Sequence, residues 1–504
     1  MNNTEIRRVV IAGGGTAGWI AAAALSRQLG SVLDITLIES EEIGTVGVGE
    51  STVPPMRVFN KLIGLDEQEF MRATAATFKL GILFENWARV GDRYIHPFGR
   101  HGRPTWLSEF HHFWLRGLEQ GVTAEIGEYC VEWLAAKHGK FATSPQSEPG
   151  PAAINYAYHI DAALYARYLR KLAESAGVKR VEGKIKEVKQ NAQTGFIEAL
   201  VMHSGETIPG DLFVDCTGFR GLLIEQTLHT GFEDWSHWLP CDSAVAVQTE
   251  TTRPAMPYTS AIAHECGWRW NIPLQHRVGN GFVYCSRYLS DEDAKNKLLA
   301  AVEGKPIRAP WQIRIRTGRR RKAWNKNCVA LGLAAGFVEP LESTSIHMIQ
   351  MGATRLMQLF PFDGIQPSLI ERFNDESRNE IEKIRDFIVL HYHTTERDDT
   401  PFWRYCRNME IPETLAKRIR LFKESAHAYQ ADGELFRVDS WIAVMLGQRI
   451  QPGHYHPFAR TVPDGDLVQS LNSFRGQVAQ TVGRLPAQMD FINQYCKASS
   501  DVWG

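Results

Sequence analysis

The fold is decided by the stretch RRVVIAGGGTAGW at residues 7–19, which leads into a helix-forming run at residues 20–29 and then into DITLIE at residues 34–39. The β-branched residues ahead of the glycines predict a strand at residues 7–12, and the last segment predicts a second strand. A strand, a helix and a second strand in this order form a βαβ unit, which is typical of an α/β fold.

Between the first strand and the helix, residues 13–18 form a GxGxxG pattern. Glycines at these places permit a tight turn and a close approach of the backbone to a pyrophosphate, and the helix N-terminus offers unpaired N–H groups. An acidic residue that ends the next strand is suited to the ribose hydroxyls. The residues predicted to bind a dinucleotide are Gly13, Gly15, Thr16, Ala17, Gly18 and Glu39. A glycine turn without a ligand is the alternative, and FAD and NAD both stay open here.

Two further strand-to-glycine turns favour FAD. They are DLFVDCTG at residues 211–218 and LGLAAG at residues 331–336, whose backbones could contact the ends of a flavin. The sequence has no second GxGxxG pattern for a nicotinamide cofactor. We therefore expect a flavoprotein that receives its reducing equivalents from another protein.

The chain of 504 residues is longer than one hydrophobic core usually supports, because cores stop growing near ~250–300 residues. Its ordinary content of 44% hydrophobic and 22% charged residues excludes a disordered or collagen-like protein. We predict an α/β (α+β) protein. A Rossmann-like FAD-binding module with mixed sheets and inserted substrate-facing segments occupies residues 1–350. A mainly helical substructure that covers the substrate occupies residues 351–504.

The charge balance argues against a polyanionic partner. Lys plus Arg number 56 against 57 for Asp plus Glu, so the chain has no global field that would hold nucleic acid or an anionic membrane. Six basic residues at positions 314–322 could form a local nucleic-acid patch, but a solvated strand face and turn is the preferred interpretation. We expect no nucleic-acid partner.

The remaining patterns indicate a soluble cytoplasmic protein without a metal. The uncharged run at residues 9–26 is interrupted by the glycine triplet at residues 13–15, and no other segment approaches the ~20 apolar residues of a membrane span. The eight cysteines form no CxxC pair, which fits a reducing compartment. The HxH pairs at residues 391–393 and 454–456 have no further ligands at metal-site spacing, so we predict no metal.

Four motifs give the chain a family resemblance. They are GVGEST at residues 47–52, Lys79 within TFKLG, WRWNIP at residues 268–273 and FVEPLEST at residues 337–344. Together they resemble the flavin-dependent tryptophan halogenases, and the W-x-W-x-I-P element is highly specific to that family. The resemblance extends from residue 7 to about residue 403.

The resemblance implies a two-component enzyme. A separate flavin reductase supplies reduced FAD (FADH2) by diffusion, and the enzyme uses it with oxygen to oxidise a halide to hypohalous acid. The acid then crosses an internal tunnel to an aromatic substrate held near a lysine. Further FAD contacts implied by the family are Gly49, Glu50, Ser51, Leu333 and Ile346. A homodimer is compatible with the sequence.

The catalytic residues implied by the resemblance are Lys79, Glu342 and Ser343. Lys79 would either donate a hydrogen bond to hypohalous acid or, if burial lowers its pKa, form a haloamine. Its alternative is a lysine at a helix end whose ammonium reaches solvent. Glu342 would stabilise the cationic ring intermediate and accept its proton.

The halide is placed by the resemblance at Thr344 and Ser345. The family usually has glycine where this chain has Ser345, which we take as an indication of bromide over chloride. Trp268 and Trp270 match the pair that keeps substrate away from the flavin and so suppresses hydroxylation. Packing in the core is the alternative for both.

The substrate contacts implied by the resemblance are His96, Phe98, Trp268, Trp270 and Trp441. Tryptophan-specific members have paired tyrosines and a glutamate that bind the amino acid, but this chain has LFRVDSW at residues 435–441 instead. An electron-rich, indole-like aromatic or a larger aromatic is therefore expected rather than free tryptophan.

Two other functions stay open on the sequence. One is a flavin monooxygenase that hydroxylates an aromatic substrate and has no use for Lys79. The other is a non-catalytic protein that binds reduced flavin.

Overall fold

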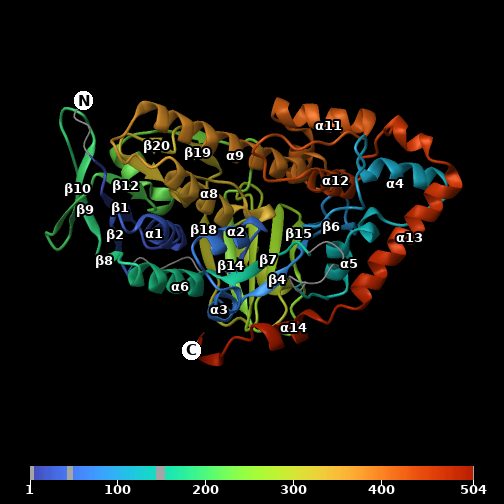
Figure 1. Cartoon of the computed structure of the whole chain (residues 1–504), viewed down its shortest axis with the longest axis horizontal. Coiled ribbons are helices and arrows are strands. Elements are labelled where there is room, and N and C mark those ends of the chain that lie inside the picture. Colours follow the sequence, from blue (N-terminus) through green and yellow to red (C-terminus); the bar gives the residue numbers. More distant parts are fainter. Residues whose placement is uncertain (1–4, 43–48, 144–153, 503–504) are drawn as a thin grey trace.

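The βαβ unit predicted at the start of the chain forms the centre of a six-stranded sheet. The computed structural model describes residues 5–42, 49–143 and 154–502 (Figure 1). β1 pairs in parallel with β2 on one side and with β12 on the other. In sheet order the strands are β20 (Trp324–Asn325), β21 (Cys328–Ala330), β12 (Leu212–Asp215), β1 (Arg8–Ala12), β2 (Asp34–Glu39) and β8 (Lys179–Glu182). The predicted Rossmann-like arrangement is confirmed.

Helix α1 (Thr16–Leu29) follows the glycine loop and is buried along most of its length. Its alanine run has a high helix propensity and leaves room for close neighbours. The helix packs between α6 (Ala162–Ser175) and α8 (Ser345–Gln358). The Asp161 side chain caps α6 by accepting from the backbone N–H groups of Ala163 and Leu164. This packing fixes the start of α1 over the edge of the sheet.

A second, seven-stranded sheet carries the WRWNIP motif on β16. Most neighbours in it are antiparallel, but β15 and β5 run parallel. In sheet order the strands are β18 (Trp311–Arg314), β14 (Ser243–Thr249), β17 (Val278–Tyr284), β16 (Gly267–Pro273), β15 (Tyr258–His264), β5 (Gly81–Glu85) and β6 (Arg93–Pro97). The mixed sheets agree with the predicted fold class.

Three small sheets complete the β structure. The sheet that bears Lys79 has the order β3 (Gly49–Ser51), β7 (Ala157–Asp161) and β4 (Thr77–Lys79). A second small sheet is the meander of β9 (Ile185–Gln190), β10 (Ile197–Met202) and β11 (Thr207–Pro209). The last sheet is β13 (Phe232–Asp234), β19 (Gly318–Arg320) and β22 (Gly336–Phe337).

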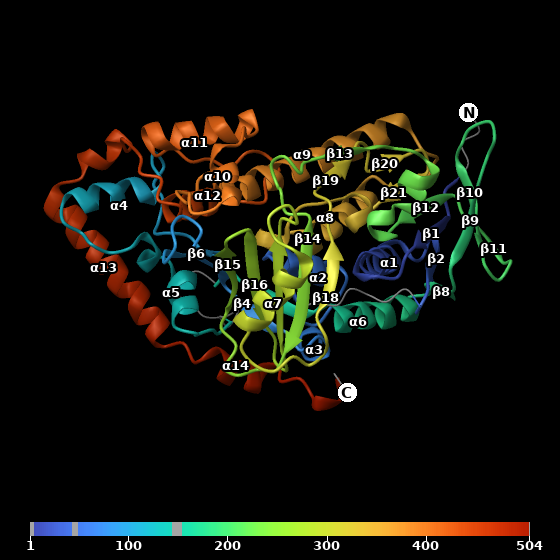
Figure 2. The same ribbon diagram turned by 180° about the vertical axis from the view of Figure 1, so that it is seen from behind.

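The chain after residue 344 is helical throughout its regular structure. Figures 1 and 2 show α9 running along one side of the sheets and α13 passing around the end of the molecule toward α14. After α8 the helices are α9 (Pro367–His393), α10 (Pro401–Asn408), α11 (Glu413–Ser425), α12 (Val438–Gly447), α13 (Asp464–Gly483) and α14 (Gln488–Tyr495). Residue 350, the predicted boundary, lies inside α8, so the division into two substructures stays a prediction.

Helices inserted between the strands of the first part complete the fold. They are α2 (Pro55–Leu62), α3 (Glu67–Ala73), α4 (Phe110–Glu119), α5 (Val131–Lys137) and α7 (Asp291–Ala301). No helix within the described ranges is both long enough and apolar enough to cross a membrane.

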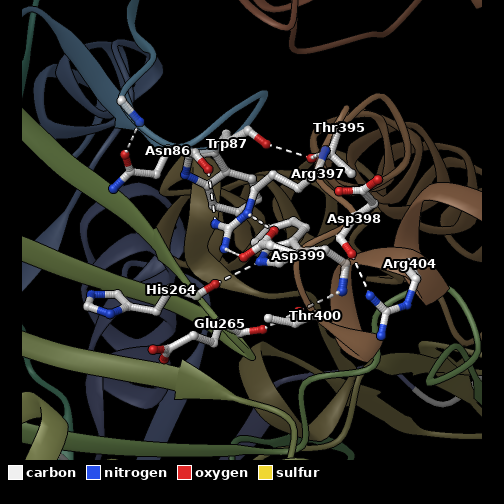
Figure 3. A network of polar contacts seen from close by, with 12 residues as sticks. Asn86, Trp87, His264, Glu265, Thr395, Arg397, Asp398, Asp399, Thr400 and Arg404 are labelled. Atoms are coloured by element: carbon white, nitrogen blue, oxygen red, sulfur yellow. Dashed lines mark hydrogen bonds and ion pairs between the residues drawn. The ribbon is translucent and has the colours of Figure 1, made fainter.

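Two large hydrophobic cores hold these layers together. One core gathers around α1, the six-stranded sheet and α6, and the other lies between the seven-stranded sheet and helices α9 to α12. The helical segment is also joined to that sheet by polar contacts centred on Arg397 (Figure 3). Arg397 pairs with Asp399 at 2.7 Å, donates to the backbone oxygen of Asn86 and stacks on Trp403. Trp403 Nε1 donates to the backbone oxygen of His264 at the end of β15. The Arg397 network therefore anchors α10 to the sheet that carries the tryptophan motif.

Candidate functional site

A cavity of about 1140 Å³ opens beside the glycine loop and the start of α1. Its volume exceeds the usual range for small-molecule sites, as an extended dinucleotide requires. The predicted cofactor residues that line it are Gly13, Gly15, Thr16, Ala17, Glu39, Gly49, Glu50, Ser51, Leu333 and Ile346. Gly18 is the exception, because a Cβ there would lie 1.8 Å from the Gly13 oxygen. Gly18 therefore serves the packing of α1 against the loop, and its role as a cofactor contact stays a prediction. Gly47 and Val48 of the GVGEST motif lie outside the described residues.

The glycine loop fits a pyrophosphate. A Cβ on Gly15 would meet nothing within 4 Å, so the backbone itself forms the wall of the cavity there. Gly13 has a φ of 109°, and a Cβ on it would lie 2.4 Å from the Cys216 oxygen. No side chain caps the first N–H groups of α1, which leaves them available to an anion.

Glu39 lies at the end of β2, where a ribose would be bound, but its carboxylate already has protein partners. Oε1 accepts from Arg180 Nε at 2.5 Å, and Oε2 accepts from Trp19 Nε1 at 3.2 Å. Glu50 also lines the cavity, and burial raises the pKa of its carboxyl group to about 7.

Lys79 stands directly behind the wall of this cavity. It ends β4 with none of its surface exposed, which excludes the solvent-reaching alternative. Its Nζ donates to Ser343 Oγ at 2.9 Å and to the Thr52 backbone oxygen at 3.0 Å, and lies 4.9 Å from the centre of the Phe98 ring. Burial lowers the pKa of Lys79 to about 7, although the charge of Glu342 opposes the shift. The amine can therefore exist in either protonation state near neutral pH.

Ser343 joins the cavity to Lys79. It lines the cavity and follows the short 3₁₀ helix Pro340–Glu342 with a φ of 62°, a left-handed conformation that is unusual for a residue other than glycine. Such conformations cluster at functional sites, where surrounding contacts hold them. The turn directs Ser343 Oγ at Lys79 and buries Glu342 beside it.

Glu342 is held between two histidines. His96 Nδ1 lies 2.9 Å from Oε2, and His391 Nε2 lies 2.9 Å from Oε1. His391 Nδ1 already donates to the Phe387 oxygen, so a proton must lie between Nε2 and Oε1 for that contact to be favourable. Although burial alone would raise the pKa of Glu342, the charge and hydrogen bonds of His96 and His391 lower it to about 2. A carboxylate with so low a pKa stabilises a neighbouring cation well but is a weak base.

The predicted halide residues lie at the start of α8. Thr344 is the N-cap residue and Ser345 begins the helix. Ser345 lines the cavity, whereas Thr344 does not, and the buried Thr344 Oγ1 has no hydrogen-bond partner in the described structure. A helix N-terminus and an unpaired hydroxyl are compatible with an anion.

The two tryptophans of the WRWNIP motif form part of the cavity wall. Trp268 and Trp270 lie with their rings 6.1 Å apart on β16. Trp268 Nε1 donates to Glu339 Oε2 at 2.9 Å, and Tyr392 donates to the same oxygen at 2.5 Å. Burial raises the pKa of Glu339 to about 7. The sequence reasoning missed this carboxyl group although it lies within the FVEPLEST motif.

The side of Lys79 where the substrate is predicted is filled with aromatic side chains. Phe387 and Phe436 stack with centroids 3.8 Å apart, a pair called here the Phe387–Phe436 stack. Trp441 packs edge-on against Phe387 at 4.9 Å, and His96 lies 6.2 Å from Phe436. The predicted substrate residues His96, Phe98 and Trp441 are buried and do not line the cavity.

Unpaired polar atoms remain among these residues. Within the described ranges, His96 Nε2, Trp270 Nε1 and Trp441 Nε1 are buried without a hydrogen-bond partner. Buried polar groups are normally paired, so atoms of this kind are suited to contact a ligand. The periodicity of α9 places Phe387 and His391 on one face, but only the fold brings them to Glu342.

The basic stretch is engaged in ion pairs. Arg314 pairs with Asp291, Arg316 with Asp234, Arg319 with Glu233 and Glu382, and Arg320 with Glu225. These pairs support the interpretation of the stretch as strand and turn, although Arg320 is buried rather than solvated. Across the described part of the chain, no three His, Cys, Asp or Glu side chains are grouped so that they could hold a metal ion.

Comparisons with known proteins agree with this geometry. A family model described as tryptophan halogenase matches residues 8–464. The tryptophan 6-halogenase SttH of Streptomyces toxytricini is 38% identical, over 98% of this chain and 99% of that protein. The structure of Xcc4156, a flavin-dependent halogenase from Xanthomonas campestris, matches with a TM-score of 0.96 and 52% identity, over 98% of this chain and 99% of that one. BrvH, a flavin-dependent halogenase from Brevundimonas sp. BAL3, matches with a TM-score of 0.93 and 42% identity, over 97% of this chain and 99% of that one. The chain belongs to the tryptophan halogenase family of flavin-dependent enzymes.

Proposed function

We propose that this enzyme halogenates an electron-rich, indole-like aromatic compound and that Lys79 delivers the halogen. The observation that carries the proposal is the position of the Lys79 ammonium. It is fully buried, has no carboxylate within ion-pair distance among the described residues, and is separated from the flavin-sized cavity by one hydroxyl, that of Ser343. Burying an ammonium without a carboxylate partner lowers the stability of the fold. The presence of Lys79 at this position therefore indicates a chemical role.

FAD would be held by the glycine loop and the start of α1 at its pyrophosphate and by residues 49–51 and 331–336 toward its ring. When bound in reduced form, it supplies the electrons and the oxygen activation that convert halide to hypohalous acid. A separate flavin reductase delivers it by diffusion. Thr344 and Ser345 would bind the halide at the start of α8, and a preference for bromide over chloride stays a prediction from Ser345.

Glu342 would act mainly as a fixed negative charge. Its low pKa, caused by His96 and His391, suits stabilisation of the cationic ring more than direct proton removal. The ring proton would then pass to His96, whose Nε2 has no hydrogen-bond partner among the described residues. His96, Phe98 and Trp441 would contact the substrate ring once the Phe387–Phe436 stack gives way to it.

An indole-like substrate is favoured over free tryptophan by the aromatic character of this side. Phe387, Phe436 and Trp441 offer ring surfaces rather than charged groups for an amine and a carboxylate. Residues 351–504 would form the cover of the substrate and residues 1–350 the flavin module. A homodimer stays compatible with this arrangement.

The test is incubation of the enzyme with a flavin reductase, FAD, bromide and indole, followed by mass spectrometry. We expect a brominated product that depends on bromide and is lost in Lys79→Ala. Lys295→Ala, which removes a lysine on the surface of α7, serves as the control. Hydroxylated product from Lys79→Ala without halide would establish the monooxygenase instead, and no consumption of any aromatic tested would favour a flavin-binding protein.

A further inference from the structure

A continuous chain of buried hydrogen bonds leads from Lys79 to the imidazole of His159. Lys79 Nζ donates to Ser343 Oγ at 2.9 Å, and Ser343 Oγ donates to Ser51 Oγ at 3.0 Å. Ser51 Oγ lies 2.6 Å from Thr259 Oγ1, which lies 3.0 Å from His159 Nε2. All five residues are buried. The separations are those of ordinary hydrogen bonds.

The far end of the chain fixes the direction of every hydrogen bond in it. His159 Nδ1 lies 2.9 Å from Thr77 Oγ1, and Thr77 Oγ1 donates to the Pro273 oxygen at 2.7 Å. Because a carbonyl can only accept, Thr77 must receive its hydrogen bond from Nδ1–H, which leaves Nε2 of His159 as an acceptor. Thr259 must then donate to Nε2. At the other end the Lys79 ammonium can only donate, so all the hydrogens point from Lys79 toward His159.

The register of the small sheet brings these groups together. His159 lies on β7, the central strand, opposite Ser51 on β3 and opposite Thr77 on β4. Lys79 ends the same strand as Thr77, and Thr259 reaches the sheet from β15. The residues of this hydrogen-bond chain come from five separate parts of the sequence, so only the fold brings them together.

We propose that this chain is a proton relay in which His159 takes the proton that Lys79 gives up. In one concerted shift a proton leaves Lys79 Nζ and another arrives at His159 Nε2. Each hydroxyl of Ser343, Ser51 and Thr259 accepts one proton and passes one on. No electrons are exchanged, and the result is a neutral amine and an imidazolium ion.

The relay gives the amine the form that it needs to react, and in this respect it rests on the proposed function of Lys79. The neutral amine attacks hypohalous acid, so that a nitrogen–halogen bond forms, the oxygen–halogen bond breaks, and hydroxide leaves with an amine proton as water. When the halogen moves to the ring, the nitrogen–halogen bond breaks and a carbon–halogen bond forms. The nitrogen takes back the proton from His159 along the same hydroxyls, and the ring proton leaves to His96. Lys79 therefore needs no contact with solvent to change its protonation state.

The surroundings of His159 favour its neutral form, so that the proton stays on Lys79 at rest. Burial, together with the charge of Lys79, holds the pKa of His159 well below its usual value, so the proton rests on Lys79. Titratable groups on neighbouring elements include Glu50 on β3, Tyr158 on β7, His264 on β15, and Asp161 at the end of β7, which pairs with Arg277 and lies 3.7 Å from His276. Lys79 itself faces Glu342. The relay thus lends a proton to His159 only while the amine reacts.

The test breaks the chain at Thr259 without changing its shape. Thr259→Val removes the hydroxyl next to His159 in an isosteric side chain, and Thr259→Ser restores it. Thr249→Val is the matched control, because Thr249 is a buried threonine of the same seven-stranded sheet that only accepts from Asn280. FAD affinity is measured for all variants, since Thr259 also lines the cavity.

We expect Thr259→Val to lower the rate of bromination of indole about 100-fold near pH 6.5, while Thr259→Ser and Thr249→Val stay close to the wild type. The deficit of Thr259→Val should shrink as the pH rises from about 6 to 9. Above the lowered pKa of Lys79 a larger fraction of the amine is already neutral and needs no relay. A purely structural defect would lower the rate equally at every pH.

The relay is wrong if Thr259→Val brominates indole at the wild-type rate near pH 6.5, if Thr259→Ser is as impaired as Thr259→Val, or if the deficit does not change with pH. Lys79→Ala is assayed beside these variants. Product from Lys79→Ala would overturn the proposed function of Lys79 itself. Loss of product in Lys79→Ala together with an active Thr259→Val would overturn the relay alone.

Discussion

The cofactor end and the Lys79 end of the site differ in their exposure and in the groups that form them. The cofactor end is an open cavity walled by backbone, where glycines at residues 13–15 and free N–H groups await a large polar ligand. The Lys79 end is closed, and its lysine, carboxylate and histidines are buried, with Glu342 held between the two histidines and the ammonium hydrogen-bonded to Ser343. Ser343 belongs to both ends.

This difference separates binding from chemistry within one site. An open wall of backbone can accept and release a diffusing flavin without rearrangement. A dry, preorganised group of charges is what strengthens electrostatic stabilisation of a cationic intermediate. Changes at one end should therefore leave the other end intact. Four experiments test this separation.

The largest effect is expected from Glu342→Gln, which removes the buried charge but keeps its shape. We expect the halogenation rate to fall by about 10²- to 10³-fold, with FAD affinity unchanged because Glu342 does not line the cavity. Rates by mass spectrometry and flavin binding by fluorescence check both parts. Glu132→Gln, at another buried carboxylate, should halogenate normally. Weakened FAD binding in Glu342→Gln would contradict the separation.

Phe436→Ala should open the closed end. Loss of the ring stacked on Phe387 is expected to cost about 3 kcal/mol of unfolding free energy and to admit larger aromatic substrates beside His96. The control Phe422→Ala removes an equally buried ring on α11 and should destabilise the protein without changing the substrates accepted. Denaturant unfolding and a competition between small and large aromatics measure the two outcomes. An unchanged substrate range in Phe436→Ala would count against the position proposed for the substrate.

Glu339→Gln tests the carboxyl group behind Trp268. The folded pKa of Glu339, raised by burial to about 7 from its usual 4.5, favours the neutral form. Its contribution to stability is therefore present below about pH 4.5 and is lost as the pH rises through 7. A glutamine cannot ionise, so the variant should gain stability relative to the wild type between pH 5 and 9, by about 1 to 3 kcal/mol. The unfolding free energies of the wild type and the variant are measured across this pH range. A difference between them that stays constant with pH would refute the raised pKa of Glu339.

The smallest effect is expected from Gly15→Ala at the cofactor end. The backbone at Gly15 suits alanine and no atom lies within 4 Å of its Cβ, so stability should not change. The methyl group enters the cavity where a pyrophosphate would approach, and FAD affinity should fall at least about tenfold. Gly476→Ala, in open space on α13, is the control and should bind FAD normally. Unchanged FAD affinity in Gly15→Ala would contradict the proposal that the pyrophosphate binds at this loop.

The sequence predicts the cofactor end better than the Lys79 end for a physical reason. A GxGxxG loop, its flanking strands and its acidic residue are local, so their pattern is complete within residues 7–39, and the βαβ unit forms there as expected. Even so, Gly18 packs against Gly13 instead of lining the cavity, because the pattern does not distinguish these two uses of glycine.

The Lys79 end is assembled from distant segments. The contact around Glu342 joins a 3₁₀ turn to His96 on β6 and His391 on α9. These two histidines are far apart in the sequence, so nothing in the sequence indicates that they bind the same carboxylate. The burial of Lys79 depends on strands that pair only in the folded chain. Resemblance to a family located the lysine and the glutamate, whereas the groups around them required the structure.

The left-handed backbone at Ser343 lowers the stability of the protein, whereas the Ser343 hydroxyl serves its activity. Glycine would relax the backbone there, so Ser343→Gly would relieve strain of roughly 1 kcal/mol and at the same time remove the hydroxyl next to Lys79. Stability and turnover therefore favour different residues at this one position. A search for hardier variants of the enzyme that selects on melting temperature alone would drift toward glycine here and discard its activity.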